Sequence, residues 1–287
     1  MNTACRTLRW STWLGWQIDS NWANPWLFAL YVLIKPLAGS LLLVCMYLAA
    51  RSATESGPAI DYLSFLYIST ACFMLIGGVM FGMSHAVVTD RESYGMLKFI
   101  RISPAHLQFY LIGRGLSRAG QALVGAILTV AVGLAVFSDL RASLNVQSIA
   151  WHWLLFYLVC GAAMLISLGL ILASTVLNMS RHGMFLSEGV AGLLYLLCGA
   201  VFPIDVLPGW MRPFSLALPP TYWLEGMRRA LLGSGSSHSA LSSWPHLHLA
   251  TALAASTLML VVFAHVLFKR CENRAWRMGK FDETSGS

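Results

Sequence analysis

Charged residues are scarce in this sequence. Only 11% of its 287 residues are charged, against about 25% in a typical soluble domain. Hydrophobic residues make up 57% of the chain, and the mean hydropathy is +0.66. This composition excludes an ordinary soluble globular protein. We expect a single integral membrane domain over residues 1–287, with no room for a second globular domain.

Several sequence motifs for nucleotide binding, disulfide or metal sites and catalysis are also missing. No Gly-x-x-x-x-Gly-Lys-Ser/Thr loop is present to bind nucleotide phosphates, so no cofactor or ATP site is expected in this chain. No CxxC pair occurs, and the six cysteines are interpreted as packing residues. His246 and His248 lie two residues apart, which puts them on different helix faces, and no carboxylate or thiol accompanies them. We therefore expect no metal site and no enzyme active site.

Long uncharged stretches dominate what remains. A spanning helix needs about 20 apolar residues, and several stretches between charged residues are longer than that. We predict an all-α integral membrane protein with six transmembrane helices, at about 26–49, 62–88, 117–137, 151–177, 183–202 and 247–268. Two charged residues fall well inside these spans, Lys35 and Glu188, whereas Arg118 is at the edge of the third span. Charges in a bilayer are costly and frequently functional, so both are candidates for a substrate path. For Glu188 the alternative is a contact with Arg181 or with the membrane interface.

Basic residues indicate the orientation. If both termini are cytoplasmic, thirteen Lys and Arg residues fall in cytoplasmic segments and five fall outside. We attribute the net charge of +7 to this topology and not to nucleic-acid binding. The expected location is the cytoplasmic membrane, with both termini in the cytoplasm.

Residues 1–22 have Trp10, Trp13, Leu14 and Ile18 at roughly helical spacing, which predicts an N-terminal interfacial helix; a frayed tail is the alternative.

The residue pattern over 90–104 predicts a short helix at the cytoplasmic surface. Gly95 permits a sharp turn and Pro104 ends the helix. Such a helix is suited to docking a soluble partner, although a plain basic loop is the alternative. We expect its apolar side chains, Leu97 and Phe99 among them, to be covered by lipid or by the partner. The candidate coupling residues are Glu92, Gly95, Met96, Leu97, Phe99, Ile100 and Arg101.

Residues 203–232 are too apolar for a loop in water and too rich in proline for a spanning helix. Broken backbone survives in a bilayer only where protein or a water-filled cavity satisfies its polar groups. We predict an external re-entrant helical hairpin before the last span. Glu225 lies one turn from Arg228 and Arg229, which indicates an ion pair in the external leaflet or, alternatively, a gate. The candidate hairpin residues are Pro203, Pro208, Tyr222, Glu225 and Arg228.

Two stretches carry a family resemblance. Residues 90–104, DRESYGMLKFIRISP, resemble the coupling region of ABC type-2 transporter permeases. Residues 202–233, FPIDVLPGWMRPFSLALPPTYWLEGMRRALLG, resemble the signature of the same family before its last helix, through Phe202-Pro203, Leu207-Pro208-Gly209-Trp210 and the Tyr222, Glu225, Arg228 spacing. The six-span layout fits as well, so the resemblance covers nearly the whole chain.

The resemblance implies a permease subunit of an ATP-driven ABC exporter. Its partners would be a separate ATPase subunit that binds ATP and Mg, a second copy of this permease or a homologous one, and membrane lipid. The implied substrate is amphipathic, lipid-like or drug-like. The rival from another class is an ion-coupled secondary transporter, which would need inverted repeats and carboxylates at the midplane. The sequence has no convincing repeat, and Glu188 is the one carboxylate inside a predicted span.

Overall fold

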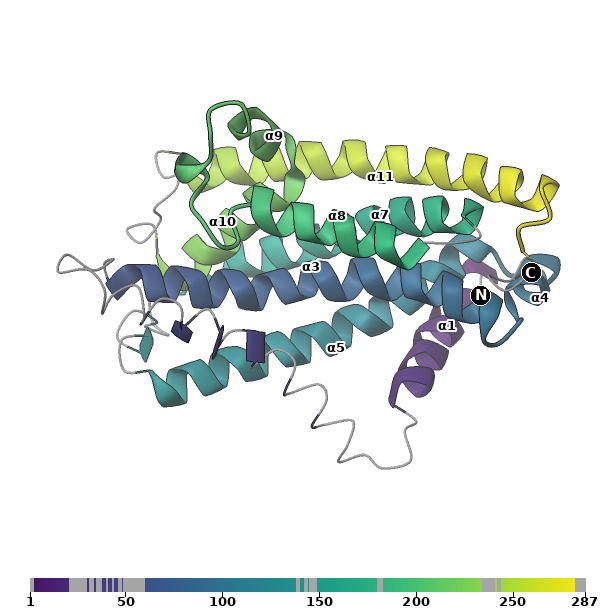
Figure 1. Cartoon of the computed structure of the whole chain (residues 1–287), viewed down its shortest axis with the longest axis horizontal. Coiled ribbons are helices and arrows are strands. Elements are labelled where there is room, and N and C mark those ends of the chain that lie inside the picture. The colour runs from purple at the N-terminus through teal and green to yellow at the C-terminus, as the bar shows by residue number, and fades with distance from the viewer. Residues whose placement is uncertain are drawn as a thin grey trace.

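The computed structural model describes residues 3–20, scattered positions between 30 and 48, and residues 60–137, 140–141, 144, 149–179, 183–233, 241 and 244–281. These residues form helices joined by turns, and four helices are long and apolar enough to cross a membrane: α3 (Ile60–Glu92), α5 (Leu107–Val136), α7 (Trp151–Asn178) and α11 (His246–Arg277). The four lie roughly along one common axis (Figure 1). A 30-residue helix is about 45 Å long, which exceeds the ~30 Å hydrocarbon core of a bilayer.

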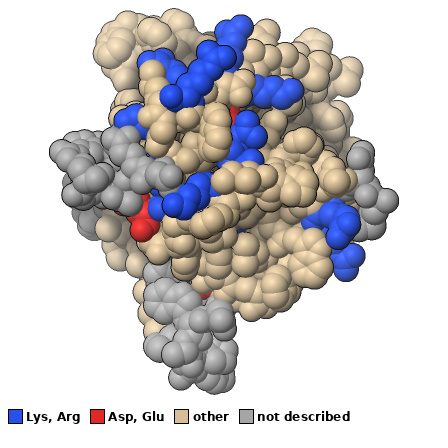
Figure 2. All heavy atoms as spheres, turned by 90° about the vertical axis from the view of Figure 1, so that its right-hand side faces the viewer, with Lys and Arg blue, Asp and Glu red and all other residues tan. Residues whose placement is uncertain are grey.

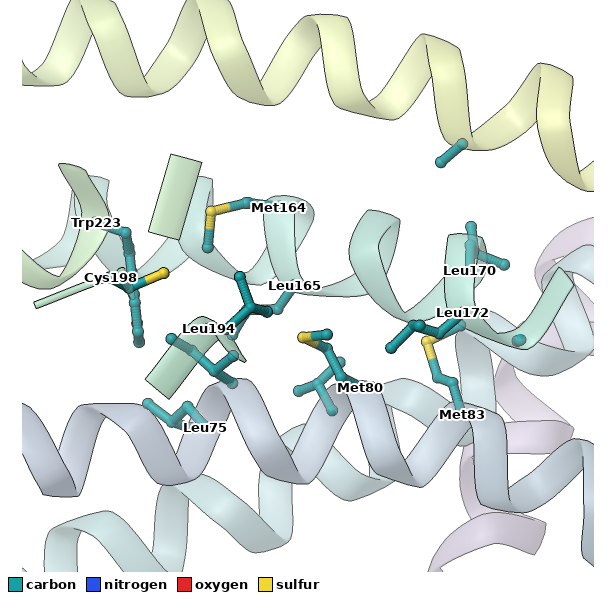
Figure 3. Close-up of a cluster of buried hydrophobic side chains, with 14 of the residues drawn as sticks. Leu75, Met80, Met83, Met164, Leu165, Leu170, Leu172, Leu194, Cys198 and Trp223 are labelled. Carbon is teal, nitrogen blue, oxygen red and sulfur yellow. The ribbon is translucent and has the colours of Figure 1, made fainter. Parts of the chain in front are cut away.

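Helix α3 is the centre of the bundle. Most of its residues are buried, and it packs against α5, α7 and the shorter helix α8 (Gly183–Leu197). Glycines allow the close approach to α5, because a Cβ added at Gly78 would lie only 2.7 Å from the Cβ of Ala122. Met83 fills the junction of three helices, since its sulfur sits against Gly115 of α5 and Gly169 of α7. Figure 3 shows this core of large apolar side chains between α3 and α7.

Large apolar side chains also cover the outer surface. Ile127 of α5, Val159 of α7 and Met259 of α11 are 59%, 62% and 75% exposed, and they have many apolar neighbours of similar exposure. Water does not tolerate apolar surface of this extent, whereas lipid tails do. The exposed faces of these helices therefore fit a multi-pass membrane protein.

Four of the six predicted spans correspond to α3, α5, α7 and α11. Three of these helices run clearly past the predicted limits. Helix α3 continues to Glu92 rather than ending at 88, α5 begins at Leu107 rather than at 117, and α11 continues to Arg277 rather than ending at 268. Arg118 and Lys269, which were taken to limit two of the spans, lie inside α5 and α11. Helix backbone continues beyond the hydrocarbon core because its hydrogen bonds are satisfied within the helix.

The fifth predicted span is shorter than expected. Helix α8 has 15 residues and is about 22 Å long, and a turn follows it directly. Gly199 in this turn has a φ of +73°, a conformation that glycine adopts at little cost and other residues avoid. The expectation of a helix through residue 202 is therefore wrong, and the break comes before Pro203. The first predicted span, 26–49, lies outside the described residues apart from isolated positions.

The bundle has two distinct ends (Figure 1). One end holds α1 (Thr3–Ser20), α4 (Leu97–Ile102) and the last turns of α3, α7 and α11. We call it the basic end, because Lys and Arg side chains gather on its surface (Figure 2). The opposite end holds the 3-10 turn η2 (Ile204–Val206), α9 (Arg212–Ala217) and α10 (Pro219–Leu232), and we call it the hairpin end.

Candidate functional site

At the basic end, the segment between α3 and α5 forms a turn and a short helix. The amide of Tyr94 donates to the carbonyl of Thr89 at 3.1 Å, which closes the last turn of α3. Gly95 then adopts a φ of +58°, so the sharp turn expected at this glycine is present. Helix α4 follows and ends where the amide of Ser103 donates to the carbonyl of Phe99 at 3.0 Å. The expected helix is therefore present, although it is only six residues long.

The apolar side chains of α4 point in two directions. Leu97 is completely buried in the core of this chain, and Met96 and Ile100 pack partly buried against the same core. Phe99 and Ile102 point outward and are 64% and 71% exposed. The expectation that lipid or a partner covers Leu97 is therefore wrong, because the chain covers this side chain itself. Phe99 and Ile102 are the apolar side chains that α4 offers to another molecule.

Arg101 ties α4 to the end of α11. Its Nε lies 3.2 Å from Oε1 of Glu272, and its guanidinium lies over the ring of Trp276 at 5.7 Å from the ring centre. Glu92, the other charged candidate, is partly exposed at the end of α3, 3.8 Å from Arg91. The partners of Arg101 are far away in the sequence, so the sequence alone gave no indication of this contact.

A buried polar cluster lies at the α3 end that carries α4. The carboxylate of Asp90 is fully buried, and it accepts a hydrogen bond of 2.7 Å from the hydroxyl of Tyr110 and lies 3.5 Å from Arg114. The neighbouring Arg91 donates to the carbonyl of Met179 at 2.9 Å, just after α7 ends. These bonds join the ends of α3, α5 and α7 into one unit. Sequence reasoning missed them, because their partners lie 20 or more residues apart.

At the hairpin end, η2, α9 and α10 form a helical hairpin between α8 and α11. Pro203 precedes η2, and the carbonyl of Pro208 accepts a 2.8 Å hydrogen bond from the amide of Met211 just before α9. The hydroxyl of Tyr222 on α10 donates to the carbonyl of Leu216 on α9 at 2.6 Å. The predicted hairpin residues therefore lie in short helical elements, and their re-entrant position in the membrane stays a prediction.

Glu225 is the centre of a buried ion cluster in α10. Its Oε2 lies 2.8 Å from Nη2 of Arg228, and its Oε1 lies 2.8 Å from Nε of Arg229. The pairing expected from the helical spacing is therefore present, and one carboxylate serves both arginines. Arg229 also donates to the backbone carbonyls of Leu241 and Trp244, just before α11. We call Glu225, Arg228 and Arg229 the Glu225 cluster.

Arg228 connects the Glu225 cluster to α3 and to the turn after α8. Its Nη1 donates to the hydroxyl of Ser69 in α3 at 2.9 Å and to the carbonyl of Gly199 after α8 at 2.8 Å. Its guanidinium also lies over the ring of Phe65, 4.2 Å from the ring centre. Removal of water makes an unpaired charge costly, and here each charge has partners. The cluster therefore fixes α10 to α3 and to the turn after α8.

Trp223 fixes α10 to α7. Its indole nitrogen donates to the carbonyl of Tyr157 at 2.8 Å, and the ring lies against Gly161, where an added Cβ would overlap it. Sequence reasoning named the tryptophan only as part of an apolar segment. A tryptophan opposite a glycine on another helix leaves no local signal in the sequence.

The structure does not bring all candidates together. Glu188 is exposed on α8, as is Phe185. Lys35 falls outside the described residues. The coupling candidates thus gather at one end of α3 and the hairpin candidates at the other end, and α3 contacts both groups.

Comparison with known proteins identifies the family to which this chain belongs. The ABC-2 type transporter family model matches residues 5–232. Two relatives, each named probable doxorubicin resistance ABC transporter permease protein DrrC and found in two strains of Mycobacterium tuberculosis, are 29% identical over 143 residues. The match covers 50% of this chain and 49% of each relative, so the chain spans about half the length of the curated relatives it matches. The family match includes α1, α4 and the hairpin through Leu232, and the chain therefore belongs to the ABC-2 type transporter family as a multi-pass membrane permease.

Proposed function

We propose that the chain is the permease subunit of an ATP-driven ABC exporter and that α4 docks into a separate ATPase subunit. The observation that carries this proposal is the exposure of Phe99 and Ile102 on a helix held in place by Leu97 and Arg101. Exposed apolar side chains beside basic ones provide both the contact area and the register that a protein partner needs. ATP and Mg would be bound by the partner.

Helix α3 would carry the movement from the ATPase to the far side of the membrane. At the basic end, Asp90 of α3 is bonded to α5, and α4 follows α3 directly. At the hairpin end, Ser69 of the same helix accepts a hydrogen bond from Arg228. A shift of α4 would therefore act on the Glu225 cluster through one continuous helix. Such a rigid element with contacts at both ends is suited to alternating between inward-open and outward-open states.

The six-span topology with cytoplasmic termini remains our proposal. The described residues nearest to both termini lie at the basic end, which supports termini on the same side (Figure 1). Helix α1 and the start of α3 lie at opposite ends of the bundle, which supports a crossing between them. The concentration of Lys and Arg at the basic end favours a cytoplasmic location for that end (Figure 2). The hairpin end would then lie in the external leaflet as a re-entrant segment.

Cysteine labelling tests this orientation. In a cysteine-free background, Gly209→Cys at the hairpin end should react in intact cells with a membrane-impermeant thiol reagent, because Gly209 is exposed and has open space around it. Ser93→Cys, exposed at the basic end, should react only after the cells are permeabilised. Labelling of Ser93→Cys in intact cells would contradict the proposed orientation.

For the substrate we propose an amphipathic, lipid-like or drug-like molecule. The relatives named for doxorubicin resistance support an amphipathic cargo. A second copy of the chain would complete the path, and Glu188 is available for it because α8 leaves this side chain exposed. Lys35 remains a candidate on sequence grounds alone.

The rival function, ion-coupled secondary transport, is less well supported. It requires carboxylates that can bind and release a cation near the midplane. The two buried carboxylates described above, Asp90 and Glu225, are each engaged by arginine side chains. A carboxylate whose oxygens are already paired with arginine is not free to bind a transported cation, which suits a structural role better than an ion-coupling role.

Transport measurements separate the two functions. The full chain should copurify with an ATPase subunit, and the complex in proteoliposomes should move an amphipathic fluorescent dye when Mg-ATP is supplied. Substitution of a non-hydrolysable ATP analogue should stop the movement, whereas an ionophore that removes ion gradients should not. Dye movement that requires an ion gradient and ignores ATP would establish the rival function.

A further inference from the structure

Helix α1 lies obliquely across the start of α5 at the basic end (Figure 1). Small residues let the two helices approach, because a Cβ added at Gly15 would lie 3.0 Å from the Cβ of Ser117. Polar contacts fix the end of α1, where Asp19 lies 2.6 Å from Arg118 and accepts a hydrogen bond of 3.3 Å from Gln121. These contacts hold α1 against α5.

A groove of about 630 Å³ lies between the two helices. Its walls are mostly apolar: α1 supplies Leu8, Trp13 and Trp16, and α5 supplies Leu116 and Gly120. Gly120 opens onto free space, since an added Cβ would meet no atom within 4 Å. Further along the same face of α5, Val124, Ile127 and Ala131 are exposed, so the groove continues into the apolar outer surface of the bundle.

Two polar groups in this groove are not satisfied by the protein. The hydroxyl of Ser117 is buried, and it has no hydrogen-bond partner in the described part of the chain. Arg9 lines the groove, is exposed and forms no ion pair with any residue that the structure describes. By contrast, the hydroxyl of Thr12 already donates to the carbonyl of Leu8 at 2.8 Å. A buried hydroxyl without a partner and a cation beside an apolar channel indicate a ligand that is anionic at one end and apolar at the other.

We propose that this groove binds one phospholipid with an anionic headgroup, from the leaflet in which α1 lies. The phosphate pairs with Arg9 and accepts a hydrogen bond from Ser117. One acyl chain lies past Gly120 along the exposed face of α5. Tryptophans at the groove suit this position, because their rings favour the depth of the lipid headgroups. The bound lipid would fill the groove between α1 and α5, a role that is independent of the transported substrate.

Filling the groove at Gly120 tests the acyl-chain contact. Lipid retention is measured by native mass spectrometry on the full-length chain, with phosphatidylglycerol as the probe and phosphatidylcholine of identical acyl chains as the reference. Gly120→Leu should reduce bound phosphatidylglycerol about tenfold, the change expected when two or more methylene groups lose their contacts. The matched control, Ala255→Leu, adds a leucine at an exposed position of α11 that does not line the groove, and it should leave retention unchanged.

A second pair of variants tests the headgroup contact. The wild-type chain should retain phosphatidylglycerol about fivefold more strongly than phosphatidylcholine, as one basic residue near a membrane surface provides. Arg9→Gln should abolish this preference. Arg6→Gln removes the same charge from an exposed position on α1 that does not line the groove, and it should keep the preference.

Three results would overturn the proposal. Equal retention of both lipids by the wild-type chain would mean that the groove does not recognise the headgroup. Equal retention by Gly120→Leu and Ala255→Leu would mean that lipid binds elsewhere. A change in oligomeric state in Gly120→Leu, with lipid retention unaltered, would make the groove a contact between copies of the chain. None of these readouts depends on ATP or on transport, so they are independent of the proposed function.

Discussion

Glu225→Ala is expected to destabilise the protein by about 3–5 kcal/mol, the usual cost of removing one partner from a buried ion pair. The carboxylate is completely buried and serves Arg228 and Arg229 together, so its loss leaves two buried guanidinium groups without their counter-charge. Thermal unfolding of the detergent-purified chain, followed by its loss of monodispersity, measures the effect. Glu188→Ala is the matched control, because this exposed glutamate on α8 should be replaced at little cost.

The reciprocal exchange Glu225→Arg with Arg228→Glu is expected not to restore stability. Arg228 also donates to Ser69 and to the carbonyl of Gly199, and a glutamate in its place would set its oxygens against that carbonyl oxygen. The new arginine at position 225 would lie beside Arg229. If the exchanged chain were as stable as the wild type, the Glu225 cluster would be a simple ion pair without a wider role in fixing α10.

Phe99→Asp combined with Ile102→Asp is expected to weaken binding of the ATPase subunit by about thirtyfold or more. A hot-spot side chain contributes about 2 kcal/mol or more at an interface, which corresponds to that ratio of dissociation constants. The chain itself should fold normally, because both side chains are largely exposed. The amount of ATPase that copurifies with the chain, and ATP-driven dye transport by the reconstituted complex, measure the result.

Two comparisons make this experiment specific to the outer side of α4. Leu97→Asp should instead reduce the yield of folded chain, because it places a carboxylate in the core where Leu97 is completely buried. Val206→Asp changes an equally exposed apolar residue at the hairpin end and should affect neither folding nor ATPase binding. Normal ATPase binding by the Phe99 and Ile102 double variant would remove α4 as the docking helix.

The sequence predicted most of the long helices correctly. The stretches without charge around 62–88, 117–137, 151–177 and 247–268 correspond to α3, α5, α7 and α11, because about 20 apolar residues in succession fit a bilayer and little else. Their ends were less predictable. Charged residues such as Lys269, Arg270 and Arg274 continue α11 outside the apolar region, and a hydropathy pattern does not distinguish such an extension from a loop.

Local spacing also predicted the Glu225 cluster and the Gly95 turn. Residues three or four apart on a helix meet regardless of the rest of the fold, and a glycine before a short helix commonly marks a turn. The same local reasoning failed for Leu97, which was expected to need a covering partner. Which side of α4 faces the core depends on where α3 and α5 place that helix, and a six-residue helix has too few residues for its own pattern to decide.

The amino-acid sequence by itself determined the class of protein, the family resemblance, the basic asymmetry between loops and the pairing within α10. These features depend on composition and on neighbours within one helical turn. Only the tertiary structure decided that Arg228 reaches Ser69, that Arg101 reaches Glu272 and that α1 and α5 enclose a groove beside Arg9. Each of these contacts joins residues that are far apart in the chain, and their meeting depends on the packing of whole helices, which no local pattern encodes.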